Sequence, residues 1–71
     1  MKLQLTFSKN LIEAVKTSSL NYAQLAKALG ITKATMSMYK NAKALPSLET
    51  FEKLCDLLDV SADYLLGRKE F

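Results

Sequence analysis

Residues 20–43 read LNYAQLAKALGITKATMSMYKNAK and contain the start and stop signals of two short helices. Asn21 can cap the first helix, and Gln24, three residues later, completes a capping box that satisfies free backbone N–H groups. Gly30 follows the last apolar residue of that helix, where glycine takes the left-handed conformation without a Cβ clash. Thr32 can cap the next helix. The stretch therefore predicts two helices joined by a tight turn.

The apolar residues of this stretch separate buried from exposed helix faces. In the first helix the apolar stripe consists of Leu25, Ala26 and Leu29. In the second helix we expect Met36 and Tyr39 to point inward. Its outer sides then carry Lys33, Ala34, Ser37, Met38 and Lys40. Two helices this close to a glycine turn favour a helix-turn-helix, whose second helix enters a DNA groove.

Length and composition favour one small helical domain. A chain of 71 residues has room for one domain, and such a domain buries about 60% of the surface that its unfolded chain exposes. Hydrophobic residues make up 49% of the chain, with only two glycines and one proline, as is typical of a folded, mostly helical protein. We therefore predict an all-α fold.

The same composition argues against several other classes of protein. Cys55 is the single cysteine and histidine is absent, so neither an internal disulfide nor the usual zinc arrangements are expected. No apolar run approaches the roughly 18 residues of a membrane span. We expect a cytoplasmic, nucleoid-associated protein without a cofactor or metal. The surface acids Asp56, Asp59 and Asp63 have no histidine or nucleophile beside them, and no catalytic residue is predicted.

Charge is divided unevenly along the chain. Residues 1–46 contain seven lysines and one glutamate, a net charge of +6, whereas residues 47–71 contain three basic and six acidic residues, a net charge of −3. This polarity orients a protein in the field of a polyanion, although solvated helix surfaces would give the same pattern.

Residues 1–6 have the alternating pattern of a half-buried strand, with Leu3, Leu5 and Phe7 separated by polar residues. We predict an N-terminal arm or short strand here, which either pairs with a partner subunit's arm, packs along the domain or frays. Ser8 is then the expected cap of the first helix, which runs to about Thr17, with Phe7 and Ile12 closing as a hydrophobic staple.

Two further helices are predicted after the loop at residues 41–46. Ser47 caps the first, whose apolar face is expected to consist of Leu48, Phe51, Leu54, Cys55 and Leu58. Ser61 caps the second, and Gly67 ends it. The predicted organisation is an arm at residues 1–6, a five-helix core at residues 7–67 and a tail at residues 68–71.

The whole pattern resembles the Cro/repressor-type (XRE) helix-turn-helix proteins. The residues that carry the resemblance are Leu20-Asn21, Leu25-Ala26, Leu29-Gly30-Ile31-Thr32, Thr35-Met36-Ser37, Tyr39, Pro46-Ser47-Leu48-Glu49-Thr50, Val60-Ser61 and Asp63-Tyr64-Leu65-Leu66-Gly67. The resemblance implies five helices with the helix-turn-helix at helices 2 and 3, double-stranded operator DNA as ligand, and a homodimer that regulates transcription, as a repressor.

The resemblance also implies which residues meet DNA. Contacts to base edges are expected from Lys33, Ala34, Ser37 and Met38. Contacts to phosphates are expected from Asn21, Tyr22, Thr35, Lys40, Asn41 and Lys43. Base contacts select sequence, whereas phosphate contacts set register and supply affinity that depends on salt.

This chain departs from the family pattern at several positions. Tyr22 replaces the usual glutamine. Val15 and Lys40 replace a basic residue and a glutamate that commonly pair, which leaves Lys40 free to attract a phosphate. Ala42 replaces a glycine, so either Asn41 takes the left-handed conformation or Ala42 is strained by roughly 1 kcal/mol or more.

Three apolar residues, Leu57, Leu3 and Leu5, are candidates for the dimer interface. They also support a second interpretation, an antitoxin or protein-interaction module of the same fold whose main ligand is a partner protein.

Overall fold

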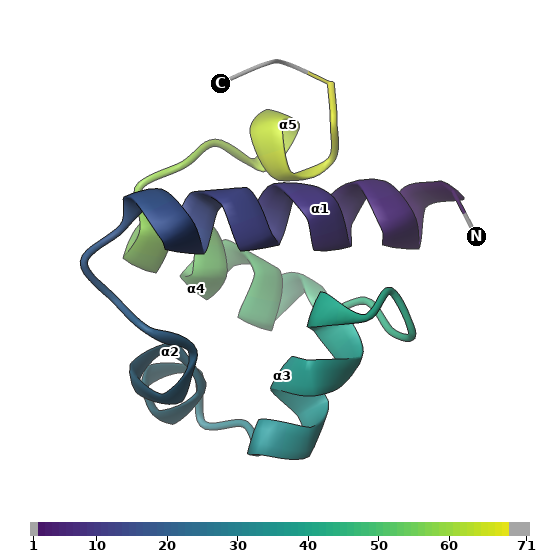
Figure 1. Ribbon diagram of the computed structural model, residues 1–71. Helices are drawn as coiled ribbons and strands as arrows, with labels where there is room; N and C mark the ends of the chain where they lie inside the picture. Colours follow the sequence, from purple (N-terminus) through teal and green to yellow (C-terminus); the bar gives the residue numbers. More distant parts are fainter. Residues whose placement is uncertain (1, 69–71) are drawn as a thin grey trace.

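Residues 2–68 are the part of the chain that this computed structural model describes, and they contain five helices joined by turns and loops (Figure 1). The helices are α1 (Lys2–Thr17), α2 (Tyr22–Leu29), α3 (Lys33–Lys40), α4 (Leu48–Leu58) and α5 (Ala62–Leu65). The predicted all-α class is confirmed. Of the predicted tail, Arg68 is described, and residues 69–71 lie outside the described part. None of the helices in residues 2–68 has both the length and the apolar character needed to cross a bilayer.

Helix α1 runs across the molecule, with α5 on one side and α2, α3 and α4 on the other (Figure 1). The largest fully buried side chains are Phe7, Leu11, Leu25, Leu54 and Leu65. Phe7 is central, because its ring centre lies 6.3 Å from that of Tyr39 in α3 and 6.1 Å from that of Phe51 in α4. The predicted core residues Leu29, Met36 and Tyr39 are buried.

The predicted N-terminal arm at residues 1–6 is wrong, because residues 2–6 form the first turns of α1. Leu3, Phe7 and Leu11 are spaced four residues apart, so they share one face of a helix as well as one face of a strand. Leu5 lies off that face and is 64% exposed. Six residues of alternation were too few to separate the two periods.

The predicted cap at Ser8 and its staple are also wrong. Ser8 lies inside α1 and is buried, and its hydroxyl donates a hydrogen bond to the main-chain carbonyl of Lys40 in α3. The hydroxyl is thus used between helices and not at a helix start. Its neighbour Phe7 points into the core.

The first turns of α1 pack against the end of α5. Asn10 Nδ2 donates a hydrogen bond of 2.8 Å to the carbonyl oxygen of Tyr64. Gly67 has a φ of +79°, and a Cβ built at this position would lie 2.3 Å from Thr6 Cγ2. Gly67 therefore permits both the backbone turn and the close approach of the two helices.

The predicted helix starts are confirmed at Asn21, Thr32, Ser47 and Ser61, each of which accepts a hydrogen bond from a backbone N–H three residues later. Gly30 ends α2 with a φ of +71°. One residue of the predicted α4 face is wrong. Leu48 is 87% exposed, because within residues 2–68 the first turn of α4 is uncovered on that side.

The left-handed residue after α3 is Ala42, with a φ of +60°, and not Asn41, whose φ is −100°. Asn41 ends the helix in the ordinary region of backbone space. The structure thus places Ala42 at the position where the family usually has glycine, and there its Cβ costs about 1–2 kcal/mol.

Candidate nucleic-acid interface

The turn between α2 and α3 fixes where α3 begins. The Thr32 hydroxyl oxygen accepts a hydrogen bond of 3.0 Å from the Thr35 backbone N–H. Thr32 Oγ1 also lies 3.0 Å from Thr35 Oγ1 and donates to it. Because the Thr35 oxygen already accepts this bond, its own hydrogen remains available for another acceptor, such as a phosphate oxygen.

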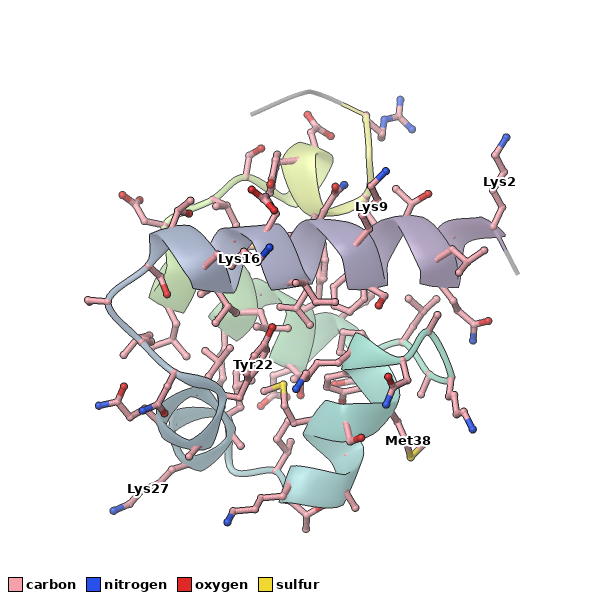
Figure 2. The ribbon with its side chains drawn as sticks, in the orientation of Figure 1. Lys2, Lys9, Lys16, Tyr22, Lys27 and Met38 are labelled. Carbon is pink, nitrogen blue, oxygen red and sulfur yellow. The ribbon has the colours of Figure 1, made fainter. Side chains whose placement is uncertain are left out.

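The outer face of α3 consists of Lys33, Ala34, Ser37 and Met38, all exposed. These positions lie one helical turn apart in two adjacent pairs, so they form one surface. Met38 is 43% exposed, and Figure 2 shows its side chain directed away from the helix bundle. The structure brings together all four residues that the sequence assigned to base contacts.

Ser37 is oriented by a residue in the predicted phosphate-contacting set. Asn41 Nδ2 donates a hydrogen bond of 3.1 Å to Ser37 Oγ. The Ser37 oxygen is thereby used as an acceptor, which leaves its hydrogen free to be donated to a base acceptor. Asn41 and Ser37 thus form one polar unit on the exposed side of α3.

Lys40 contacts an aromatic ring and no carboxylate among the described residues. Its ammonium nitrogen lies 3.9 Å from the centre of the Tyr22 ring, which is a cation–π contact between the end of α3 and the start of α2. Val15, at the position of the missing basic partner, is buried in the core. An apolar contact and a cation–π contact therefore stand where the family commonly has an ion pair.

Tyr22 itself is half-buried. Figure 2 shows its side chain extending from α2 toward the middle of the molecule, whereas Lys27 of the same helix extends into solvent. Burial raises the pKa of the Tyr22 hydroxyl above its usual value. The hydroxyl therefore stays protonated and can donate a hydrogen bond.

A groove of about 280 Å³ lies between α2 and α3. Its lining residues are Tyr22, Ala23, Ala26, Lys33, Met36, Ser37 and Lys40. Two lysines, a tyrosine and a serine are among these residues, and no aspartate or glutamate is. We call this the α2–α3 groove, and its electrostatics favour an anion.

The other predicted phosphate-contacting residues, Asn21, Thr35, Asn41 and Lys43, are not among the lining residues of this groove. Asn21 is exposed, and its side-chain oxygen accepts a hydrogen bond of 2.8 Å from the Gln24 backbone N–H. Its amide nitrogen remains as a donor. Lys43 is exposed in the loop after α3.

Sequence reasoning missed an apolar groove of about 180 Å³ on another side of the molecule. It is lined by Leu3, Phe7, Leu45, Pro46, Leu48, Phe51 and Leu66. Of the three predicted interface residues it includes Leu3 alone; Leu5 and Leu57 are exposed elsewhere. The signal was the row Leu45-Pro46-Ser47-Leu48, in which Leu48 was expected to lie on the apolar face of its helix.

Comparison with known proteins places these features in context. A family model described as "Helix-turn-helix" matches residues 11–65. The HTH-type transcriptional regulator AnsR of Bacillus subtilis is 44% identical over 55 residues, which is 78% of this chain and 46% of that protein. The HTH-type transcriptional regulator YqaE of the same organism is 37% identical over 60 residues, 84% of this chain and 52% of that protein.

A phage protein is also similar. The CTXphi transcriptional repressor RstR of Vibrio cholerae is 37% identical over 46 residues, which is 65% of this chain and 41% of the repressor. The chain thus spans about half the length of the curated relatives that it matches. The comparison with solved structures gave no match.

Proposed function

We propose that this chain, which belongs to the XRE-type helix-turn-helix family, is a sequence-specific DNA-binding transcriptional repressor. We place it in the cytoplasm. One observation carries the proposal. The exposed face of α3, with Lys33, Ala34, Ser37 and Met38, borders a groove whose lining residues include two lysines and no acidic residue. The names of the relatives, two transcriptional regulators and one transcriptional repressor, support the same function.

The residues of the α3 face make polar and apolar contacts with base edges in the proposed complex. Lys33 donates to guanine O6 and N7, the acceptors that basic side chains most often contact. Ala34 and Met38 make apolar contact with thymine methyl groups, and Ser37 donates to a base acceptor. These few hydrogen bonds select sequence only weakly. We therefore expect DNA shape and deformability to supply part of the specificity.

We further propose that the protein acts as a homodimer on a pseudo-palindromic operator. Two α3 helices about 34 Å apart would then enter successive major grooves on one side of the duplex. The apolar groove supports this proposal, since Leu3, Leu45 and Leu48 expose a cluster of apolar surface that a monomer leaves in water.

The second candidate is a protein-interaction module of the same fold, such as an antitoxin. The observation that favours it is the same apolar groove, which a different protein could cover. Under this alternative the groove binds the main ligand, and DNA binding is secondary. The two candidates are separated by measuring the purified protein without a partner. The repressor should dimerise and bind DNA tightly, whereas in the interaction module DNA binding is secondary.

The test begins with selection of bound sequences from a random duplex pool, which reports both specificity and half-site symmetry. Fluorescence anisotropy then compares the selected duplex with random DNA over a salt series. We expect Lys33→Ala to lower the ratio of specific to random affinity about tenfold or more, since a good bidentate contact discriminates by about 1–3 kcal/mol.

Lys27→Ala is the matched control, because Lys27 is exposed on α2 and the substitution removes the same charge. It should leave the specificity ratio unchanged. If Lys33→Ala weakens binding to the selected duplex and to random DNA equally, Lys33 does not contact a base. A protein without any salt-dependent affinity for DNA would overturn the proposed function itself.

A further inference from the structure

We propose that Tyr22 and Lys40 act as one unit that holds a single phosphate group of the DNA backbone at the α2–α3 groove, with Tyr22 as the positioning residue. The proposal rests on the proposed function, since it names how that DNA is held. It assigns the affinity of this contact to the aromatic ring of Tyr22 as well as to the charge of Lys40.

Two contacts fix Lys40 before any ligand arrives. Its main-chain carbonyl accepts the hydrogen bond from the buried Ser8 hydroxyl, so the base of its side chain is anchored to α1. Its ammonium nitrogen lies 3.9 Å from the centre of the Tyr22 ring. The long side chain therefore runs between two fixed points.

The ammonium of Lys40 is not neutralised by a carboxylate. The ion pairs found within residues 2–68 join Lys53 to Glu49 and Arg68 to Asp63, on α4 and around α5. An aromatic ring attracts a cation without cancelling its charge, and it accepts no conventional hydrogen bond. The N–H donors of the ammonium group that point away from the ring remain available to oxygen acceptors.

The groove suits a phosphate group better than a base. Its volume of about 280 Å³ leaves room for a phosphate group. Lys33 and Ser37 of α3 line it together with the pair, so further donors of α3 lie beside Lys40. The Tyr22 face that Lys40 covers is closed to base stacking, the usual way in which aromatic residues bind nucleotides.

The ring contributes by ordering Lys40 in advance. A free lysine side chain loses rotamer freedom when it is immobilised at an interface, and this loss weakens binding. Because Tyr22 already restricts the side chain, less freedom is lost when a phosphate binds. The ring and not the hydroxyl provides this effect, so phenylalanine should replace Tyr22 and leucine should not.

A double-mutant cycle measured by anisotropy tests this coupling on the selected duplex. Lys40→Met, which keeps an apolar stem, should weaken binding severalfold on selected and random DNA alike and reduce the salt slope by about one. Tyr22→Leu should weaken binding about threefold with Lys40 present and have no effect with Met at position 40. Tyr22→Phe should bind like the parent protein, and Lys27→Met is the charge control.

Single methylphosphonate substitutions along the duplex test the ligand. We expect one backbone position per half-site whose neutralisation weakens the parent protein but not Lys40→Met. This measurement requires only the Lys40 variant, so it stands even if Tyr22→Leu fails to fold. Circular dichroism establishes which variants are folded.

Three results would overturn the proposal. Independent, multiplicative effects of Tyr22→Leu and Lys40→Met would show that the residues do not act as a unit. If every methylphosphonate weakened the DNA binding of the parent protein and of Lys40→Met equally, the proposed phosphate contact would be ruled out. Competition by inorganic phosphate beyond that of chloride at equal ionic strength, if abolished by Lys40→Met, would assign the groove to a free anion. An absence of salt-dependent DNA binding would instead refute the proposed function.

Discussion

The hydroxyl of Ser8 in α1 donates a hydrogen bond to the main-chain carbonyl of Lys40, the last residue of α3. The last carbonyls of a helix have no partner within it, so this bond from a buried side chain satisfies one of them. It also anchors the C-terminal end of α3, the helix proposed to enter the DNA groove, to α1.

Ser8→Ala should lower the free energy of unfolding by about 1–3 kcal/mol, because it leaves a partly buried carbonyl without a donor. Urea denaturation followed by circular dichroism measures the change. Ser19→Ala is the control, since Ser19 is exposed in the loop after α1. Equal stabilities of the two variants would show that the bond to Lys40 contributes nothing.

Gly67→Ala should destabilise the protein more than Gly30→Ala. Both glycines have positive φ, so both substitutions incur the backbone cost of about 1–2 kcal/mol. At Gly67 the new Cβ would also lie 2.3 Å from Thr6 Cγ2, whereas at Gly30 it meets no atom within 4 Å.

Thr6→Ser removes that methyl group and should recover the steric part of the cost. The same urea titrations, run as a Gly67→Ala and Thr6→Ser cycle, measure the coupling. Additive effects of the two substitutions would mean that α1 and the end of α5 do not approach as closely as described.

Ala42→Gly should stabilise the protein by about 0.5–1 kcal/mol, because glycine has no Cβ to strain at positive φ, although it gives the unfolded chain more freedom. Ala42 has a φ of +60°. Ala28→Gly, at an exposed position within α2, should have the opposite sign, with a cost of about 0.5–1 kcal/mol. Thermal unfolding of the two variants distinguishes them, and a lower Tm for Ala42→Gly would contradict the prediction.

Cys55 should react slowly with thiol reagents. Burial raises the pKa of its thiol above the usual 9.0, and the charges of Asp56 and Glu52 raise it further, although a backbone hydrogen bond acts in the opposite direction. At pH 8 the folded protein should therefore react with Ellman's reagent more slowly than the urea-unfolded chain.

The same pKa shift predicts how stability depends on pH. A thiol whose pKa is higher in the folded state contributes stability below its unfolded pKa and loses it as pH rises through the folded value. Cys55→Ala should therefore show a smaller loss of stability above pH 9 than the parent protein. Identical alkaline profiles would exclude this contribution.

Leu48→Glu should weaken the proposed homodimer, because it places a charge beside the apolar groove. A glutamate at the start of α4 is favourable for the helix itself, so the monomer should remain folded. Leu57→Glu is the matched control, from an exposed leucine in the last turn of the same helix. Sedimentation equilibrium gives the dimer dissociation constant, and loss of the dimer only in Leu57→Glu would place the interface at the other end of α4.

The parts of the fold that the sequence predicted depend on neighbouring residues. Asn21 and Gln24 form the expected capping box, with bonds of 2.8 and 2.9 Å. Gly30 ends α2 in the left-handed conformation. Such signals act within one helical turn, so they can be identified without knowing where the rest of the chain lies.

The parts that were missed depend on tertiary contacts. Tyr22 and Lys40 are 18 positions apart, and only the packing of α2 on α3 brings the ring beneath the ammonium group. The spacing of Leu3 and Phe7 fits a strand as well as a helix. The packing of this segment beside the end of α5 is not encoded in that spacing. The exposure of the proposed base-contacting residues was predicted correctly, whereas their contacts with DNA remain predictions.

The hydrogen bond between Asn10 and the Tyr64 carbonyl joins residues 54 positions apart. Closing so long a loop costs entropy that only the completed contacts offset. On a ribosome the capped turn between α2 and α3 is synthesised well before α5, which supplies the fully buried Leu65. The local signals that begin α3 are therefore present early in the growing chain, but the core closes only when almost all of the described residues have emerged.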